Sequence, residues 1–237
     1  MVMLVGAYYG FDATYILVLI GVIICMAASA KVNSTFQKYA RVHSASGMTG
    51  AQAADKLLRS NGIYDVRIEH ISGNLTDHYD PKNKVLRLSD ATYGSSSVAA
   101  VGVAAHECGH AIQHAKGYAP LQIRSNIVPI ANIGSKLSWP LILLGVILSW
   151  NHTLITIGIV LFSFAVLFQL VTLPVEFDAS KRAVRLLGEN GILYGQEVDQ
   201  TKKVLQAAAL TYVAGAASSI LQLLRLILLF GRRGGND

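Results

Sequence analysis

The sequence predicts an α-helical membrane protein with about four transmembrane helices and one small α+β unit. Two observations of composition lead there: hydrophobic residues make up 52% of the 237 positions, and charged residues only 14%. A soluble domain averages about 25% charged residues. The same hydrophobicity excludes intrinsic disorder, which needs an apolar content too low to form a core. A third observation is that the apolar residues gather in stretches of membrane-spanning length.

The first apolar stretch, residues 13–30, carries no charge, and no Lys or Arg precedes it. A cleaved signal peptide needs a positive region before its apolar core, so we interpret this stretch as an uncleaved transmembrane helix. Residues 130–173 contain two further spans, which form a hairpin around a short turn at Asn151. The last span, 206–230, includes Gln222 and Arg225. Because of these polar residues, this segment has an alternative interpretation: a helix that lies partly against the protein and does not cross the membrane.

Two polar segments lie between the spans, at 31–129 and 174–205, and a two-span hairpin returns the chain to the side that it left. Most of the 20 basic residues fall in or beside these segments. The positive-inside rule then places both of them in the cytoplasm. The formal net charge of +6 does not indicate nucleic-acid binding, because no basic stripe is interleaved with aromatic residues.

The segment 31–129 has the pattern of a small folded unit. Thr49 and Gln52 have the spacing of a helix capping box. Residues 63–71 alternate as a strand, 75–80 and 84–89 are expected to form a β-hairpin, and 97–117 is expected to form a helix.

That last helix carries the motif His106-Glu107-Cys108-Gly109-His110. Histidines four residues apart lie on one helical face and can each donate one nitrogen to the same zinc ion. Glu107, beside the first histidine, is placed to take a proton from a metal-bound water. Cys108 is expected to face away from the metal as an inert packing residue, and Gly109 is expected to allow another backbone close by.

A catalytic zinc needs a third protein ligand and an open position. The metzincin motif would need glycine and histidine where this chain has Gln113 and Lys116, which excludes that class. The intramembrane site-2 class has a ligand aspartate shortly after an N-x-x-P motif; here residues 126–129 have that pattern, but residues 130–134 after it contain no aspartate. The remaining arrangement takes the third ligand from a second helix.

Four acidic residues downstream are candidates for this ligand: Glu176, Asp178, Glu189 and Glu197. Glu176 is favoured because it opens a helical pattern directly after the third span, where the hairpin would bring it beside the first helix. Asp178 is a possible orienting partner for a ligand. Glu189 adjoins a helix-end signature, and Glu197 suits the N-terminal end of a later helix.

Three separated motifs, at residues 75–81, 103–114 and 173–180, resemble the YugP-type neutral zinc metallopeptidases of bacterial membranes. The resemblance covers nearly the whole chain. It implies a zincin-like, gluzincin-like unit with one Zn²⁺ per chain, His106, His110 and Glu176 as ligands and Glu107 as catalyst. The architecture is also similar to HtpX-type and CAAX-prenyl endopeptidases, which carry aspartate where this chain has Ser180.

Three further residues have both a functional and an ordinary interpretation. His78 and Tyr79 lie on the expected hairpin, whose edge can pair with a substrate backbone, and either could polarise a carbonyl; turn and packing roles are the alternative. His114 lies one helical turn after His110 and could assist an oxyanion, or it could be an exposed helix residue.

The sequence thus predicts a multi-pass protein of a bacterial plasma membrane, with its catalytic side in the cytoplasm. Its expected partners are the lipid bilayer and the membrane or membrane-proximal proteins whose peptide bonds it would hydrolyse by zinc-activated water. The competing hypothesis is a non-catalytic membrane scaffold with a structural zinc site. A structural site would be closed by a fourth protein ligand, and Glu107 would then have no catalytic reason to be glutamate.

Overall fold

The computed structural model describes residues 12–231, which separate into two compact units. We call residues 28–122 and 173–211 the sheet unit. The described residues that remain, 12–27, 123–172 and 212–231, form the helical unit. The two units are treated separately below.

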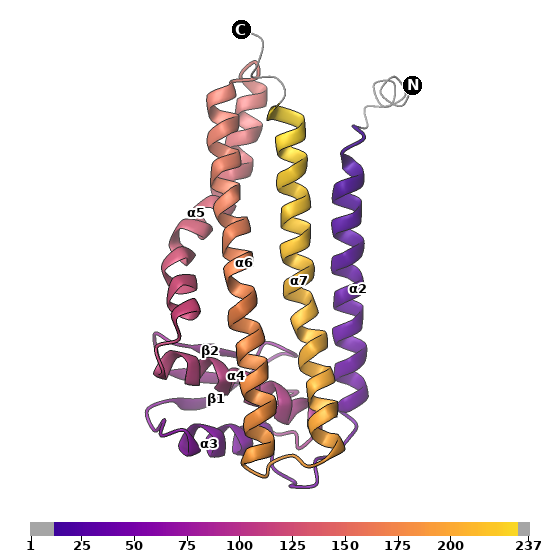
Figure 1. Cartoon of the computed structure of the whole chain (residues 1–237), viewed down its shortest axis with the longest axis vertical. Coiled ribbons are helices and arrows are strands. Elements are labelled where there is room, and N and C mark those ends of the chain that lie inside the picture. The colour runs from indigo at the N-terminus through magenta and orange to yellow at the C-terminus, as the bar shows by residue number, and fades with distance from the viewer. Residues whose placement is uncertain (1–11, 232–237) are drawn as a thin grey trace. The chain divides into compact units, whose positions relative to one another are not determined.

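The sheet unit contains a three-stranded sheet and two short helices (Figure 1). In chain order these are α3 (Gly50–Ser60), β1 (Arg67–Ile71), β2 (His78–Asp80), β3 (Val85–Ser89) and α4 (Val98–Ala115). The unit also includes parts of four longer helices, at residues 28–39, 119–122, 173–189 and 196–211. The strand order is β1-β3-β2, with β1 parallel and β2 antiparallel to β3. The predicted hairpin is therefore confirmed, and its short first strand β2 forms one edge of the sheet.

Strands β1 and β2 both begin later than predicted and are therefore shorter than expected. The prediction began the first strand at residue 63, but Gly62 has φ +74° and Ile63 N–H bonds to Leu58 O at 3.0 Å. Ile63 thus belongs to the C-terminal cap of α3, where its side chain is buried. The prediction began the second strand at residue 75, but Leu75 has φ +56°, a left-handed conformation that a strand excludes.

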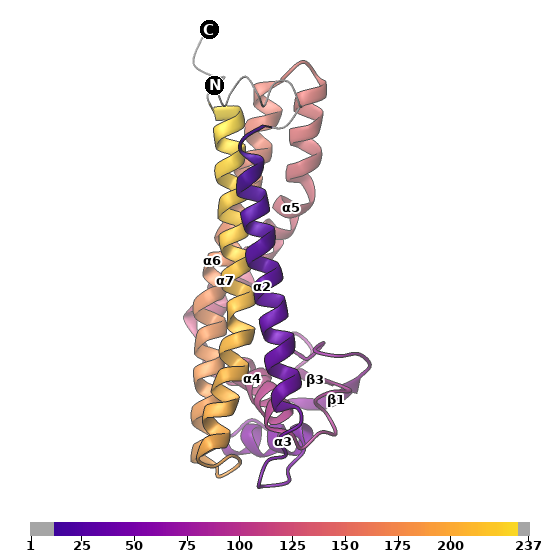
Figure 2. The same cartoon turned by 90° about the vertical axis from the view of Figure 1, so that its right-hand side faces the viewer.

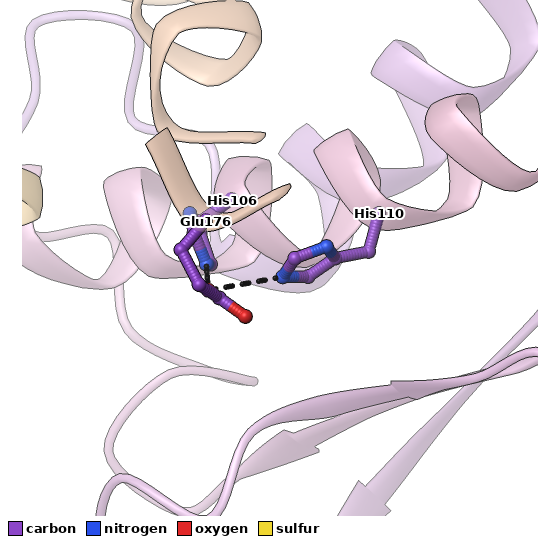
Figure 3. A group of neighbouring side chains, drawn as sticks. All are labelled: His106, His110 and Glu176. Carbon is purple, nitrogen blue, oxygen red and sulfur yellow. Dashed lines mark hydrogen bonds and ion pairs between the residues drawn. The ribbon is translucent and has the colours of Figure 1, made fainter. Parts of the chain in front are cut away.

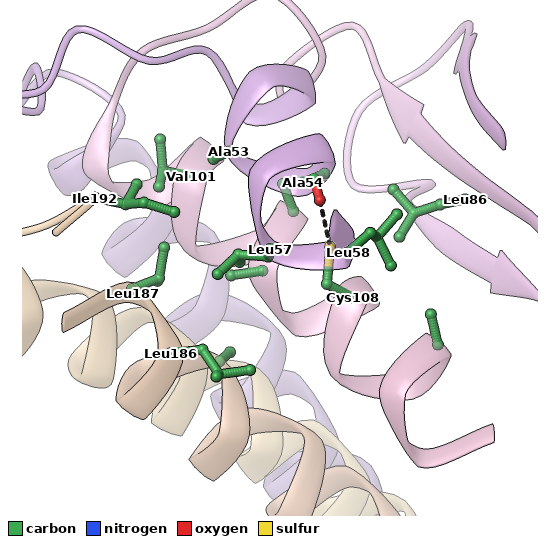
Figure 4. Close-up of a cluster of buried hydrophobic side chains, with 14 of the residues drawn as sticks. Ala53, Ala54, Leu57, Leu58, Leu86, Val101, Cys108, Leu186, Leu187 and Ile192 are labelled. Atoms are coloured by element: carbon green, nitrogen blue, oxygen red, sulfur yellow. Dashed lines mark hydrogen bonds between the residues drawn. The ribbon is translucent and has the colours of Figure 1, made fainter. Parts of the chain in front are cut away.

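Helix α3 covers the core with its apolar face (Figure 4). The predicted capping box at its start is confirmed: Gln52 N–H bonds to Thr49 Oγ1 at 3.3 Å, and Thr49 N–H bonds to Gln52 Oε1 at 3.0 Å. Four of its side chains are fully or almost fully buried: Ala53, Ala54, Leu57 and Leu58. Cys108 of α4 is buried against them, its thiol 3.6 Å from Ala54 O, so the predicted packing role is confirmed.

Helix α4 begins at the N-cap Ser97, whose hydroxyl accepts a hydrogen bond from Ala100 N–H. Most of its residues are buried, and it packs mainly on α3 and also contacts β2 and β3 (Figure 2). Such close packing requires small side chains. Its run of alanine, glycine and valine supplies them.

Within residues 12–231, four helices are long and apolar enough to cross a membrane, as the sequence predicts. They are α2 (Tyr15–Tyr39), α5 (Ala119–Ile147), α6 (His152–Glu189) and α7 (Gln196–Phe230). Each extends beyond its predicted apolar stretch. Helix α6 continues through Pro174, where a new helix was expected to start. An internal proline removes one backbone hydrogen bond, and the long regular segments on both sides keep the helix intact.

The helical unit packs through close backbone contacts. A Cβ added at Gly134 of α5 would lie 2.3 Å from the carbonyl oxygen of Leu161 of α6. The turn between these two helices has positive φ angles at Ser149 and Trp150. Large apolar side chains of this unit are exposed in the structure, such as Ile147 at 69%, which suits a lipid environment.

Candidate metal centre

The three predicted ligands come together in the sheet unit (Figure 3). His106 and His110 lie one turn apart on α4, with ring centroids 4.8 Å apart, and Glu176 reaches them from α6. Glu176 Oε2 lies 3.2 Å from His106 Nε2 and 3.4 Å from His110 Nε2. The Glu176 side chain is only 2% exposed, whereas the two imidazoles are 13% and 12% exposed. One side of the group is therefore accessible.

A glycine allows the two helices to approach this closely. A Cβ on Gly109 would lie 2.7 Å from the carbonyl oxygen and 3.0 Å from the Cα of Ala179 on α6. Real Cβ atoms essentially never lie within 3.0 Å of such an atom. The prediction that Gly109 admits a neighbouring backbone is confirmed, and the neighbour is the helix that carries Glu176.

The second nitrogen of each imidazole has its own partner. His106 Nδ1 lies 3.1 Å from Ser180 Oγ, and His110 Nδ1 lies 3.0 Å from Gln113 Oε1. These contacts leave both Nε2 atoms directed at Glu176. Two imidazole nitrogens and one carboxylate, within 4.8 Å of one another, are a donor set that fits zinc. Among residues 12–231 the group comprises these three side chains, the number of protein ligands that is typical of catalytic zinc sites.

The carboxyl of Glu107 interacts electrostatically with His106, His110 and Glu176. Glu107 is only 9% exposed. Burial raises the pKa of its carboxyl above the ordinary value, and the charges of Glu176 and Asp77 add to this, although the two histidines oppose it. A raised pKa favours a carboxylate that must accept and then return a proton near neutral pH. Sequence reasoning did not single out Asp77, whose carboxylate accepts hydrogen bonds from the N–H and hydroxyl of Ser89.

The remaining predicted residues divide between the two faces of the sheet. The Tyr79 hydroxyl lies 2.9 Å from His114 Nδ1, on the face that contacts α4. Burial, together with the charges of Asp65 and Asp80, raises the pKa of Tyr79 to about 12, so the phenol keeps its proton at neutral pH. The His78 ring instead contacts Thr76 O at 2.9 Å and Arg87 Nη1 at 3.4 Å, apart from the three ligand side chains.

The other acidic candidates lie outside the group of three. Asp178 approaches it indirectly, because its Oδ2 accepts a hydrogen bond from Gln113 Nε2 at 2.8 Å. Glu189 ends α6, and Glu197 lies in the first turn of α7, as predicted for these two residues. The Glu197 carboxylate accepts hydrogen bonds from Tyr194 N–H just before that helix and from Ala45 N–H of a distant loop.

Gln113 contacts His110, and Ser180 contacts His106. In the sequence, Gln113 only excluded the metzincin class, and Ser180 only marked a difference from the HtpX-type motif. The helical spacing of Gln113 from His110 and of Ser180 from Glu176 is the one signal that could have pointed to them.

Comparisons with known proteins identify the family. The family model described as "Putative neutral zinc metallopeptidase" matches residues 14–231. The chain belongs to this family. The protein described as "Putative membrane protease YugP" of Bacillus subtilis (strain 168) is 48% identical over 203 residues, covering 86% of this chain and 90% of that protein. No solved structure matches the chain. The predicted resemblance to the YugP-type neutral zinc metallopeptidases is confirmed.

Proposed function

We propose that this protein is a membrane-embedded zinc metalloprotease of the HExxH-plus-glutamate type, which hydrolyses peptide bonds of membrane or membrane-proximal proteins. His106, His110 and Glu176 hold one Zn²⁺ per chain. The observation that carries the proposal is the convergence of these three donor groups beside a buried Glu107, in a chain whose family is that of neutral zinc metallopeptidases.

Zinc, when bound, supplies Lewis acidity, which polarises a scissile carbonyl and lowers the pKa of a water molecule. Glu107 accepts the proton of the attacking water and delivers it to the leaving nitrogen. Its burial keeps bulk water from competing for that proton. Tyr79 keeps its phenolic proton, and where His114 Nδ1–H donates to the phenol oxygen that proton is available to the developing oxyanion.

The edge strand β2 offers a surface along which an extended substrate can pair. Arg67 N–H donates to Lys84 O at 3.0 Å, which fixes the phase of the parallel ladder so that Arg87 directs its backbone groups toward β2. The antiparallel register pairs Arg87 with His78. The N–H and C=O of Tyr79, one residue on, therefore point away from β3 and are available to a substrate strand.

The competing hypothesis is a scaffold with a structural zinc. A structural zinc site has four protein ligands, whereas the group found among the described residues has three. In a scaffold, the burial of Glu107 as a carboxylate would also cost free energy and serve no catalytic function. Both points favour the enzyme.

A single set of variants tests the proposal. In the purified protein, Glu107→Gln is expected to keep one zinc per chain and to lose hydrolysis of an internally quenched peptide by at least about 100-fold, because general acid–base catalysis contributes that much or more. His106→Ala, His110→Ala and Glu176→Ala are expected to lose zinc as well, and Glu189→Ala serves as the matched acidic control. Wild-type hydrolysis in Glu107→Gln would overturn the proposal.

We assign the sheet unit to the cytoplasmic side of a bacterial plasma membrane from the distribution of basic residues in the sequence. Cysteine reporters at residues 60, 84 and 190 should then all be labelled from the cytoplasm, and a reporter at Asn151 from the opposite side; residue 84 is exposed, whereas the neighbouring Val85 is buried. Labelling of 84 and 190 from different sides would contradict the assignment.

A further inference from the structure

Gln113 is a fully buried polar side chain that the proposed reaction does not use. It lies on α4 three residues after His110 and is 0% exposed. Burial of an amide costs free energy unless its donors and acceptor are hydrogen-bonded. Here the amide makes three hydrogen bonds: Oε1 accepts from His110 Nδ1, and Nε2 donates to Val175 O and to Asp178 Oδ2.

These three contacts determine which way the amide faces. Val175 O and Asp178 Oδ2 both lie 2.8 Å from the same terminal atom of the side chain. A backbone carbonyl and a carboxylate can only accept, so this atom must be the NH₂ group. Arg182 Nε–H donates to the same carboxylate oxygen, which therefore accepts from both side chains. The amide oxygen must therefore face His110.

The orientation of the amide in turn fixes the tautomer of His110. An amide oxygen has no proton to give, so Nδ1 of His110 must carry the hydrogen. In the neutral imidazole, the form that binds a metal ion, the lone pair is then on Nε2, the atom that faces Glu176 at 3.4 Å. His106 has no such constraint, because the Ser180 hydroxyl beside its Nδ1 can either donate or accept.

We propose that Gln113 is the positioning residue of the metal centre: it holds His110 in the tautomer and orientation that present Nε2 to the ion. Since its NH₂ group bonds to the carbonyl of Val175, the residue before Glu176, the same side chain also sets the distance between the ligand on α4 and the ligand on α6. This inference rests on the proposed zinc site. It adds a residue that acts through His110 and touches neither substrate nor metal.

Gln113→Met tests the inference, because methionine fills a similar volume and removes all three hydrogen bonds. The zinc affinity, measured by competition with a chromophoric chelator, is expected to fall by about 10- to 100-fold, as for other outer partners of metal ligands. The visible spectrum of the Co²⁺-substituted protein is expected to change. Gln200→Met is the matched control: Gln200 is a half-buried glutamine of α7 in the same unit, and its variant should keep the wild-type affinity and spectrum.

A purely structural role gives a different result. It would lower the melting temperature of the apoprotein and of the zinc-loaded protein equally and would leave the zinc affinity and the Co²⁺ spectrum unchanged. That result would overturn the inference. Should Gln113→Met not fold, Asp178→Ala carries the test, since Asp178 is 25% exposed and its loss frees one side of the amide. The expected loss of zinc affinity is then severalfold, and an unchanged affinity overturns the inference.

If the proposed function is wrong, the outcome differs both from a loss of zinc affinity in the Gln113 variant and from a loss of stability alone. In that case the wild-type protein itself would not bind zinc in a manner that depends on His106 and Glu176. The inference is judged only by the ratio of variant to wild-type affinity.

Discussion

The two sides of the metal centre differ in how their polar groups are used. On the ligand side, where α4 meets α6, the Nδ1 atoms of both histidines and the amide of Gln113 have hydrogen-bond partners within the protein. On the edge side, β2 directs the backbone groups of Tyr79 away from the sheet. A site that must hold an ion in one geometry needs fixed side chains. A site that must accept many peptide sequences needs backbone groups that do not depend on sequence.

The helical unit uses the same steric device as the ligand side for a different purpose. Gly109 lets α4 approach Ala179 of α6, and Gly134 lets α5 approach Leu161 of α6 in the hairpin. In lipid, close backbone packing is itself a main source of helix association, because the surroundings are as apolar as the helix surfaces. In the sheet unit the same closeness brings Glu176 to the histidines.

The largest effect is expected from a substitution that prevents the close approach of α4 and α6 on the ligand side. Gly109→Ala forces its Cβ against the Ala179 carbonyl, and such overpacking costs about 1–3 kcal/mol of folding free energy. We expect the displaced α6 to weaken zinc binding by up to about 100-fold, as measured by chelator competition. Gly134→Ala is the matched variant in the helical unit. It should lower thermal stability and leave zinc affinity unchanged, and equal zinc loss in both variants would contradict the distinction.

A smaller effect is expected on the edge side. Tyr79→Pro removes the N–H that points away from β3, which an edge strand tolerates without loss of its own ladder. Compared with Tyr79→Ala, which keeps that N–H, the proline variant should lose about one hydrogen bond to the substrate, or about 2- to 12-fold in kcat/KM. Zinc content should be the same in both. Equal kcat/KM values in the two variants would show that β2 does not pair with the substrate.

An effect of the same small size, here on zinc affinity, is expected at Ser180, the partner of His106. Ser180→Ala removes a neutral hydroxyl contact at 3.1 Å, whose net contribution is about 0.5–1.5 kcal/mol. Zinc affinity should fall by about 2- to 12-fold, less than in Gln113→Met, because a hydroxyl does not fix the histidine tautomer. A loss in Ser180→Ala greater than that in Gln113→Met would reverse the order of importance within the ligand side.

The sequence by itself determined the four long apolar helices, the amphipathic face of α3 and the position of the HExxH motif on α4. Each depends on composition or on periodicity over a few turns, which a local stretch of sequence contains in full. It also favoured Glu176 over the other acidic residues, because hairpin connectivity limits where the chain can return. The continuation of α6 through Pro174 was missed, since a helix boundary at a proline is only a statistical preference.

The tertiary structure alone decided the sheet order, the lengths of β1 and β2, and the partners that His106 and Gln113 find on α6. The contact of His106 with Ser180 joins residues 74 apart in sequence, and that of Gln113 with Val175 joins residues 62 apart. Neither partner has a periodic signal, because a hydrogen bond between two helices depends on their separation and rotation. Gly109 sets that separation, since without a Cβ it lets α6 come near enough for the side chains to meet.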